Sequence, residues 1–355
     1  MDRGGEPVGM ILCAGLGTRL RPLTDVLPKP AIPVAGLPLV RWSLALLAGA
    51  GVRRAAVNVH HLPDRMAEAA VAAGRAVGVE VAVSREPVIA GTGGALREAR
   101  SLLGGASEVV VVNGDVLFDV NLAAALAAHR EAAKAGALAT MLLLPMPPGA
   151  RFATVDVDGE GAVRRIAGRG AGPEVKLAPW HFSGVHVVSP GLLERIPAEP
   201  FECDVNRHVY PPLFEAGAVR GLVVSGYWND LGTPARYLEA TADVLSAKVP
   251  LARFRGADPW PGCELAPGAE PSQRICAARG TQIDPAARLH GPVIVGEGAE
   301  IDCGAEIGPA TVIGAGARIG AGACVRRAIV WPGTEVKPGE HVENAIAAGS
   351  ERVRG

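Results

Sequence analysis

Lysine, aromatic residues and excess charge are all scarce in this sequence of 355 residues. Aromatic residues make up 4% of the chain, and 35 Lys and Arg nearly balance 36 Asp and Glu, which leaves a formal net charge of −1. This balance gives no reason to expect a nucleic acid or an anionic membrane as partner. Lysine occurs only at positions 29, 134, 176, 248 and 337. A lysine inside a motif is therefore more informative here than in most proteins.

The sequence also lacks a Cys-x-x-Cys pair and a histidine cluster beside its six cysteines. This pattern indicates neither a zinc site nor a disulfide framework, so we expect free thiols in a reducing cytoplasm. The longest apolar runs, such as Leu44–Val52 and Ala137–Leu144, are too short to span a bilayer. The N-terminus lacks the basic region and cleavage site of a signal peptide. We expect a cytoplasmic protein.

The composition is that of a folded, two-domain chain. Hydrophobic residues account for 49% and charged residues for 20%, which is enough apolar content for a core and argues against disorder. At about 100–200 residues per domain, the length suggests two domains. We expect a first domain over residues 1–246 and a second over 283–355. Residues 247–282 are rich in proline and glycine, so we expect a linker or an irregular first coil there.

The first two thirds alternate apolar strands with helical stretches. Strands are expected at Val8–Ala14, Ala55–Val59, Val79–Val83, Val109–Val112 and Ala137–Leu144. Helices are expected at Leu39–Ala50, Pro63–Ala76, Gly94–Leu103 and Leu122–Ala135. Hairpin-like pieces follow at Ala153–Asp158, Gly161–Ile166 and His181–Val188, and helices return at Val209–Ala216 and Pro234–Ser246. Repeated β-α-β order predicts an α/β, Rossmann-like domain with a mostly parallel mixed sheet.

The last part of the chain is a repeat. Aliphatic residues recur every six positions at Ile283, Leu289, Val295, Ile301, Ile307, Ile313, Ile319 and Val325. One interval of five then reaches Val330, and sixes resume at Val336 and Val342. Hexapeptide periodicity is typical of a parallel β-helix, in which three sixes make one coil and the aliphatic side chain points inward. We expect a left-handed parallel β-helix.

A glycine-rich stretch near the N-terminus indicates a nucleotide site. It reads Gly15-Leu-Gly-Thr-Arg-Leu-Arg-Pro-Leu-Thr24 and is followed by Pro28-Lys-Pro30. Bare backbone N–H groups can approach phosphate oxygens closely, and Arg19 adds a bidentate donor. Lys29 lies between prolines that we expect to hold the backbone extended. Gly15-x-Gly17 alone is also compatible with an ordinary strand-to-helix turn, and neither the dinucleotide fingerprint nor the Walker loop fits.

These motifs resemble the signature of the sugar-1-phosphate nucleotidyltransferases. The resemblance continues through Asn58-Val-His-His-Leu62, Gly91-Thr-Gly-Gly94, Asn113-Gly-Asp115, Asp204-Val-Asn-Arg207 and Trp228-Asn-Asp-Leu-Gly-Thr-Pro234. It therefore covers nearly the whole chain, since a C-terminal hexapeptide β-helix occurs in several branches, including the mannose-1-phosphate guanylyltransferases. It implies in-line attack of a sugar 1-phosphate on the α-phosphorus of an NTP, with pyrophosphate leaving.

The resemblance also implies a Mg²⁺ ion, which prefers carboxylates together with phosphate oxygens. Asp115 follows an expected buried strand, and Asp230 lies in the family's second metal motif, so both are predicted metal ligands. A turn or N-cap aspartate is the alternative for Asp115. The expected catalytic residues are Arg19, Lys29 and Asp115, because neutralising charge between two anions should dominate catalysis.

The expected substrate contacts come from several motifs. The expected nucleotide-binding residues are Leu12, Ala14, Gly15, Gly17, Thr18, Arg19, Lys29, Thr92, Gly93, Asn113 and Gly114. The expected sugar-phosphate residues are Gly94, Arg169 and Ser183. Thr92 matches a position that helps to choose the base, and a helix N-cap with glycines for tight packing is the alternative. Ser183 has the alternative of a strand residue satisfied by the backbone.

The sequence departs from the family near the sugar. Many members carry Glu-Lys-Pro after the hairpin, whereas this chain has Gly168 and Arg169 at the Glu and Lys positions. Phe152-Ala153 stands where Tyr-Gly is usual. Lys176 is either a substitute phosphate ligand or a solvated surface lysine. Cys13 is expected to be a small buried residue rather than a nucleophile.

Two further residue groups are assigned supporting roles. Asp204–Arg207 is expected to order a loop near the sugar, with a helix-facing ion pair as the alternative for Arg207. His60 and His61 are expected to be structural.

Several functions remain open at this stage. Within the family, GTP with mannose 1-phosphate is favoured, and thymidylyl or uridylyl transfer to glucose 1-phosphate is the runner-up. Acyl transfer by the hexapeptide domain would need a histidine base, for which His290 and His341 lie near the ends of the repeat. A regulatory homologue without turnover is the third class. We also expect the β-helix to mediate self-association into a homo-oligomer.

Overall fold

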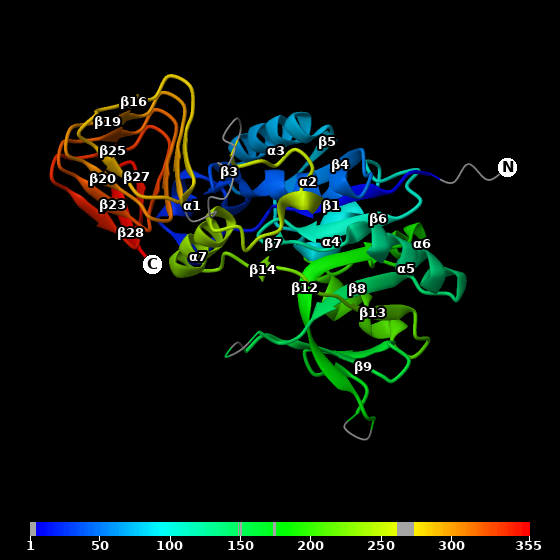
Figure 1. The fold of residues 1–355 in the computed structure, drawn as a ribbon. Coiled ribbons are helices and arrows are strands. Elements are labelled where there is room, and N and C mark those ends of the chain that lie inside the picture. Colours follow the sequence, from blue (N-terminus) through cyan, green and yellow to red (C-terminus); the bar gives the residue numbers. More distant parts are fainter. Residues whose placement is uncertain (1–4, 148, 150, 173–174, 261–272) are drawn as a thin grey trace. The chain divides into compact units, whose positions relative to one another are not determined.

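The structure is a computed structural model that describes residues 5–147, 149, 151–172, 175–260 and 273–355 (Figure 1). Its contacts divide the chain into two compact units. The first unit comprises residues 1–16, 43–228 and 253–256, and the second comprises residues 17–42, 229–252 and 257–355. Both units therefore draw on segments that are far apart in the sequence.

The first unit is built on a ten-stranded mixed sheet. Its parallel strands lie in the order β6 (Val109–Asn113), β1 (Val8–Leu12), β4 (Arg54–Val59) and β5 (Glu80–Arg85). The valine-rich β6 and β1 are buried along nearly their whole length, as expected for strands covered on both faces. Leu12 is in register with Asn58 and Asn113, so the three carboxyl ends are level.

The rest of this sheet is largely antiparallel, so the expected mostly parallel order holds only from β6 to β5. The remaining strands are β8 (Ala139–Leu144), β9 (Thr154–Val157), β10 (Val163–Ile166), β11 (Arg169–Gly170), β12 (Ala178–Val188) and β13 (Val219–Val223). β12 runs antiparallel to β6, β8 and β9, and only β13 is parallel to its neighbour β8. Short hairpins join β9 to β10 and β10 to β11, and such connections require antiparallel neighbours.

The helices confirm most of the expected pattern. The longer ones are α2 (Leu39–Gly49), α3 (Pro63–Val77), α4 (Gly91–Glu98), α5 (Leu122–Lys134) and α7 (Pro234–Leu245). Short elements are α1 (Leu23–Val26), α6 (Pro190–Leu193), β7 (Leu117–Phe118) and β14 (Trp228–Asn229). The expected helix at 209–216 is wrong. A π-helical turn at Val205–Val209 and a 3₁₀ turn at Pro211–Leu213 replace it, because two consecutive prolines remove the N–H donors a longer helix needs.

The second unit contains the C-terminal repeat, whose strands form three parallel sheets. The first holds β15 (Ile275–Ala277), β18 (Val293–Val295), β21 (Thr311–Ile313), β24 (Ile329–Val330) and β27 (Ala345–Ala348). The second holds β16 (Gln282–Ile283), β19 (Glu300–Ile301), β22 (Arg318–Ile319) and β25 (Glu335–Val336). The third holds β17 (Arg288–Leu289), β20 (Glu306–Ile307), β23 (Cys324–Arg326) and β26 (His341–Glu343).

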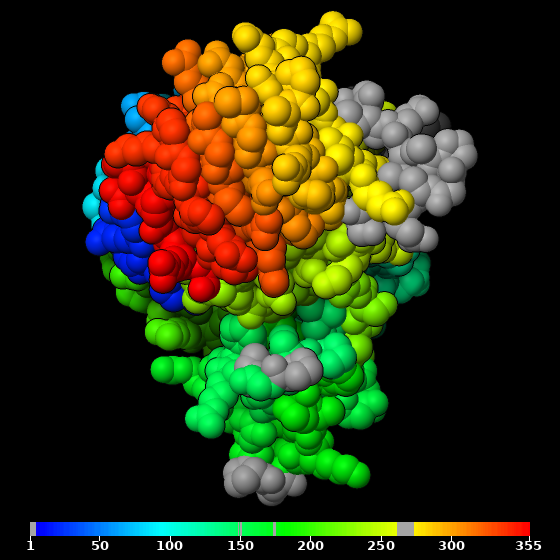
Figure 2. All heavy atoms as spheres, turned by 60° about the vertical axis from the view of Figure 1, so that its left-hand side comes forward, coloured from blue at the N-terminus to red at the C-terminus, as the bar shows by residue number. Residues whose placement is uncertain are grey.

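The register of these sheets is that of three-sided coils, consistent with a β-helix. Ile283 pairs with Ile301, and Ile301 with Ile319, so one coil takes three sixes. Ile319 then pairs with Val336, which is one residue closer, as the interval of five predicts. The aliphatic side chains form one buried core. Figure 2 shows one face of these coils, which follow one another from yellow through orange to red.

The two ends of the repeat differ from its middle. β15 lies inside the segment expected to be a linker or irregular first coil, yet it pairs with β18 as a regular strand. At the other end, β28 (Glu351–Arg354) runs antiparallel to β27. The second unit also holds a small hairpin of β2 (Pro33–Val34) and β3 (Leu37–Pro38). α7 contacts β2, β27 and β28.

The cysteines require a correction. Cys13, Cys203, Cys303 and Cys324 are free, as expected. Cys276 is disulfide-bonded, so the expectation of free thiols is wrong for it. Among the described residues, no helix is long and apolar enough to cross a bilayer.

Candidate active site

The signature loop of the second unit is closed on itself by a threonine. Gly17 has φ of 61°, in the left-handed region that favours glycine. A Cβ there would lie 2.9 Å from Cγ2 of Thr24 and 3.2 Å from Cβ of Lys29. The Thr24 hydroxyl donates to the Gly17 carbonyl at 3.0 Å. Glycine at 17 therefore serves both the turn and the close packing of the loop.

Lys29 is held in place rather than extended toward solvent. It begins a 3₁₀ turn, Lys29–Ala31, so the expected extended backbone is confined to Pro28, where φ is −60° and ψ is 145°. The Lys29 side chain is buried, and its Nζ donates to the backbone carbonyl of Asp230 at 2.7 Å. Burial and this acceptor together orient the ammonium.

Asp230 brings three predicted residues together within this unit. Its Oδ1 forms an ion pair with Nε of Arg236 at 2.8 Å and accepts from the Gly232 amide at 3.2 Å. A Cβ on Gly232 would lie 2.7 Å from Nη1 of Arg19 and 2.9 Å from Oδ2 of Asp230. A larger residue at 232 would therefore displace the ends of these side chains. Arg19, Lys29 and Asp230 form one charged cluster.

In the first unit, the predicted residues Gly114 and Asp115 lie just beyond the carboxyl end of β6. The Gly114 amide donates to the carbonyl of Leu12 at 2.9 Å. A Cβ on Gly114 would lie 2.6 Å from Sγ of Cys13, so this turn also requires glycine. Asp115 is half-buried just beyond it. Burial, and then the charge of Asp115, raises the pKa of the Cys13 thiol, which agrees with a structural role for that residue.

Sequence reasoning missed Glu86, a buried carboxylate behind the loop. Its Oε1 accepts from Nδ2 of Asn58 at 2.8 Å, and its Oε2 accepts from the Ala90 amide at 3.0 Å. Oδ1 of Asn58 in turn accepts from the Cys13 amide at 2.8 Å. The available signal was a lone glutamate between the end of β5 and an apolar stretch. Because buried carboxylates need partners, that position predicts a network.

The Gly91–Gly94 segment, which forms the first turn of α4, packs against Cys203, in agreement with the tight-packing alternative. The carbonyl of Cys203 accepts from the amides of Gly93 at 2.7 Å and Gly94 at 3.0 Å. A Cβ on Gly91 would lie 2.6 Å from that carbonyl oxygen. The N-cap position of α4 is Ala90, and Oγ1 of Thr92 instead accepts from a neighbouring backbone amide, that of Val205, at 2.9 Å.

Arg97, which the sequence did not single out, holds the segment that leads to Cys203. Its Nη1 donates to the carbonyls of Pro197 at 2.7 Å and Ala198 at 3.1 Å, and its Nη2 donates to that of Phe201 at 2.9 Å. The guanidinium carbon also lies 5.5 Å from the centroid of the Phe201 ring. These contacts use the fixed fork of arginine to fasten a loop that has little regular structure of its own.

The residues predicted near the sugar have diverse environments. Ala167 and Gly168 have φ of 50° and 78° and form the two-residue turn between β10 and β11. Positive φ at both turn positions favours glycine, which explains why Gly168 replaces glutamate. Arg169 is exposed on β11. Ser183 is fully buried; its hydroxyl donates to the Leu142 carbonyl at 2.8 Å, as the strand alternative expects.

An aromatic group lies beside Ser183. The ring of His181 lies 4.5 Å from those of both Phe152 and Trp228, measured between centroids. Nε1 of Trp228 donates to the carbonyl of Ser183 at 2.8 Å. The Phe152 that replaces the usual tyrosine therefore takes part in a packed cluster and brings no hydroxyl to it.

The supporting residues mostly behave as expected. Asp204 orders its own loop, because its Oδ1 accepts from the Arg207 amide at 3.0 Å. The side chain of Arg207 is exposed, and so is Lys176. Nδ1 of His60 lies 2.9 Å from the Glu86 carbonyl, which agrees with a structural role.

The donor chemistry of two aspartates fits magnesium. Within the described ranges, no three His, Cys, Asp or Glu side chains form a group that could hold a metal ion. Mg²⁺ does not need such a cage, since it binds one or two carboxylates together with water and substrate phosphates. Asp115, half-buried at a strand end, and Asp230 both offer hard oxygen donors. Asp230 is now engaged by Arg236, so a cation there would share its carboxylate.

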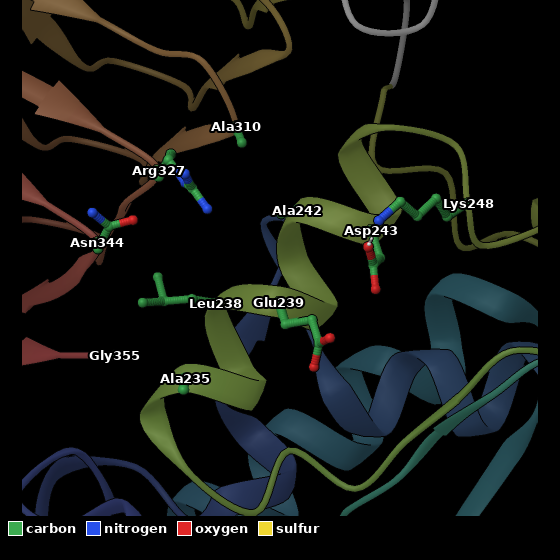
Figure 3. Close-up of a pocket in the computed structure, with 10 residues that line it drawn as sticks. All are labelled: Ala235, Leu238, Glu239, Ala242, Asp243, Lys248, Ala310, Arg327, Asn344 and Gly355. Atoms are coloured by element: carbon green, nitrogen blue, oxygen red, sulfur yellow. Dashed lines mark hydrogen bonds and ion pairs between the residues drawn. The ribbon is translucent and has the colours of Figure 1, made fainter. Parts of the chain in front are cut away.

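A separate groove of about 420 Å³ runs along α7 (Figure 3). Leu238 and Ala242 line it from the helix, and Arg327 and Asn344 line it from turns of the repeat. Lys248 pairs with Asp243 at 2.8 Å at its edge. None of the predicted site residues lines this groove.

Comparison with known proteins follows the two regions of the chain. Residues 8–247 match the nucleotidyl transferase family, and residues 289–354 match the GMPPB C-terminal domain. A mannose-1-phosphate guanylyltransferase of Mycobacterium tuberculosis is 32% identical over 80% of this chain and 78% of its own length.

Two other relatives broaden the comparison. The catalytic subunit beta of a mannose-1-phosphate guanylyltransferase from Danio rerio is 28% identical over 64% of this chain and 62% of its own length. A UTP–glucose-1-phosphate uridylyltransferase of Synechocystis is 30% identical over 73% of this chain and 67% of its own length.

Proposed function

Because the chain belongs to the nucleotidyl transferase family, we propose that it transfers a guanylyl group from GTP to mannose 1-phosphate. The products are the nucleotide sugar and pyrophosphate. The observation that carries this proposal is the cluster of Arg19, Lys29 and Asp230, in which two cationic side chains are held at a glycine-rich loop. That cluster suits a reaction whose main difficulty is bringing two anions together.

In this mechanism a phosphate oxygen of the sugar phosphate attacks the α-phosphorus of the NTP, and the bond to the β-phosphate bridging oxygen breaks. Lys29 and Arg19 stabilise the negative charge on the phosphates. The buried Lys29 ammonium is oriented by the Asp230 carbonyl, so little reorganisation is needed on binding. Asp115 and Asp230 would hold Mg²⁺, which supplies charge neutralisation on the phosphate oxygens.

The choice of GTP and mannose 1-phosphate rests on the relatives. The Mycobacterium tuberculosis relative, whose name gives that activity, matches 80% of this chain, against 73% for the uridylyltransferase, and residues 289–354 match the GMPPB C-terminal domain. The left-handed sense of the β-helix, the division at residues 246 and 283, the cytoplasmic location and self-association through the repeat belong to the same proposal. They are supported by the resemblance and by the coil register alone.

A second candidate is uridylyl transfer to glucose 1-phosphate. The Synechocystis relative, 30% identical, supports it. The turn at Gly168 favours neither candidate, since the glutamate that usually contacts the sugar is replaced there and the sugar preference has to be set by other residues.

A substrate matrix tests both candidates. GTP, UTP, dTTP, ATP and CTP are each combined with mannose, glucose and other sugar 1-phosphates in the presence of Mg²⁺, and pyrophosphate release is measured. The proposal expects the highest kcat/KM for GTP with mannose 1-phosphate. A higher value for UTP with glucose 1-phosphate would replace it with the second candidate. A folded protein that is silent throughout the matrix would favour a regulatory homologue.

A further inference from the structure

Tyr237, on the helix α7 that follows Asp230, is hydrogen-bonded to the chain segment that carries Lys29. It lies in the first turns of α7 and is fully buried. Its hydroxyl donates to the carbonyl of Pro33 at 2.5 Å. Pro33 opens the β2–β3 hairpin and comes only four residues after Lys29. The bond therefore fixes the far end of the short segment that carries Lys29.

The same hydroxyl is also tied to the repeat. Nε1 of Trp331, a buried residue that follows β24, donates to Oη of Tyr237 at 3.2 Å. The hydroxyl therefore has both an acceptor and a donor partner within the second unit. Burial raises the pKa of Tyr237, so the phenol stays protonated and continues to donate to Pro33. A side chain with both roles filled has one allowed orientation.

The Lys29 segment is short and held at both ends. At its start, Nζ of Lys29 donates to the Asp230 carbonyl. Within it, the Ile32 amide donates to the Lys29 carbonyl at 3.2 Å, and the Leu39 amide donates to the Ile32 carbonyl at 3.0 Å. At its end, Tyr237 holds Pro33. Both outer anchors, Asp230 and Tyr237, come from one stretch of chain that leads into α7.

We propose that Tyr237 is a positioning residue that sets the place of the Lys29 ammonium, and that Trp331 braces it from the repeat. The C-terminal repeat thereby contributes to the geometry of the phosphate-binding cluster from within the same chain. The expected change in kcat rests on the proposed function. The expected change in the order of the Lys29 segment does not depend on that function.

The kinetic test compares two tyrosines. Tyr237→Phe removes the hydroxyl and keeps the ring. Tyr210→Phe is the matched control, because Tyr210 is equally buried but its hydroxyl contacts His186 in the first unit. We expect kcat of Tyr237→Phe to fall by about tenfold or more with KM changed by less than about threefold, as for a small misplacement of a catalytic group. Tyr210→Phe should retain kcat within about twofold even where its thermal stability falls equally.

The structural test measures access to Lys29 without substrate. The folded proteins are labelled with an amine-reactive acetyl ester, and the rate at each lysine is followed by mass spectrometry. Lys134, which is exposed, is the internal reference. We expect Lys29 to be protected in the native protein and in Tyr210→Phe. In Tyr237→Phe its rate relative to Lys134 should rise by about fivefold or more, as local opening becomes easier.

The outcomes separate the two proposals. An active native enzyme whose kcat and Lys29 labelling are both unchanged by Tyr237→Phe overturns the positioning role and leaves the proposed function intact. A native protein that is inactive throughout the substrate matrix overturns the proposed function, and the labelling test still decides the role of Tyr237. Trp331→Phe removes only the indole donor, so it should change labelling in the same direction by less; no change there would remove the repeat from the proposal.

Discussion

The two glycine-rich loops of this protein differ in what stands next to their backbones. At Gly15, no atom lies within 4 Å of the position that a Cβ would take. At Gly91 and Gly93, that position is occupied by the backbone or the thiol of Cys203. One loop leaves open space beside a glycine, and the other uses its glycines to let two chain segments meet.

The segment at Gly91–Gly94 is also closed by hydrogen bonds. The amides of Gly93 and Gly94 already donate to the Cys203 carbonyl, so they are engaged before any ligand arrives. The loop at Gly15 instead leads directly to the exposed Thr18 and Arg19. A run of glycines in a sequence therefore has two physical explanations, access for a ligand and close packing of backbone, and composition alone does not separate them.

The largest expected effect comes from removing the cation beside the open loop. Lys29→Ala should lower kcat/KM by about 100- to 1000-fold, because a preoriented charge near the phosphates is lost. Lys134→Ala, on the exposed face of α5, is the matched control and should retain full activity. Pyrophosphate release measures both. Asp115→Ala should lose activity to a similar extent. Near-native rates in Lys29→Ala and Asp115→Ala, with the fold intact, would refute the assigned mechanism.

A pair of alanine substitutions tests the comparison directly. Gly93→Ala places a Cβ 2.9 Å from Sγ of Cys203 and should destabilise the fold by about 1–3 kcal/mol through overpacking. Gly15→Ala should change the free energy of unfolding by less than about 0.5 kcal/mol, since its Cβ has room. It should instead raise KM for the NTP, because the Cβ obstructs the approach of phosphate.

Chemical denaturation and steady-state kinetics on both variants give the result. The opposite pattern, a destabilised Gly15→Ala and a stable Gly93→Ala with raised KM, would reverse the roles of the two loops. Adding Cys203→Ala to Gly93→Ala removes the thiol contact and should recover part of the lost stability as a favourable coupling.

A smaller effect is expected at Arg97, whose guanidinium holds the segment that leads to Cys203. Arg97→Lys keeps the charge but cannot reproduce the three carbonyl contacts, so it should cost about 1–2 kcal/mol of stability. Thermal unfolding measures this loss. Arg207→Lys, an exposed arginine of the same region, serves as the control. An equal loss in both variants would show that the Arg97 contacts contribute nothing specific.

The smallest effect is a pH dependence of the free energy of unfolding that comes from the buried His186. Burial lowers the pKa of His186 to about 3 from its ordinary 6.5. Below pH 6.5 the unfolded chain therefore binds a proton that the folded chain does not. The free energy of unfolding decreases as the pH is lowered. Between pH 6.5 and 5.5 this histidine alone should cost about 1 kcal/mol.

Substitution isolates this contribution. His186→Gln should be less sensitive to acid over that pH range than the native protein, in denaturation curves recorded at each pH. His341→Gln replaces an exposed histidine of the repeat and should leave the native pH dependence in place. Identical acid sensitivity in His186→Gln and native protein would contradict the assignment.

Local patterns predicted much of the fold. The six-residue spacing from Ile283 to Val325 gave the coils, because a narrow interior admits one inward aliphatic side chain per face. The single interval of five before Val330 gave the shorter coil that the register contains. Arg19 and Lys29 could be singled out together because a rare lysine and a glycine turn stand in one short stretch.

Other features depend on partners far along the chain. Thr92 is bonded to Val205, 113 residues away, and no local pattern near Thr92 announces that contact. Glu86 has one local signal, its place before an apolar stretch, but its partners Asn58 and Ala90 are visible only in the structure. The strand β12 runs antiparallel to β6 and β9, neither of which directly precedes it in the chain, so its own sequence does not show its direction.

The antiparallel β28 limits how this protein can change in length. A stack of parallel coils can in principle grow by addition of one more coil at its end, since each coil offers the next the same pairing edge. Here the last parallel strand of the first sheet, β27, is paired with a strand of opposite direction, β28. A new coil appended after β28 would meet the wrong hydrogen-bonding pattern. Lengthening by duplication is therefore restricted to the interior, where a whole coil of 17 or 18 residues can be inserted without disturbing either end.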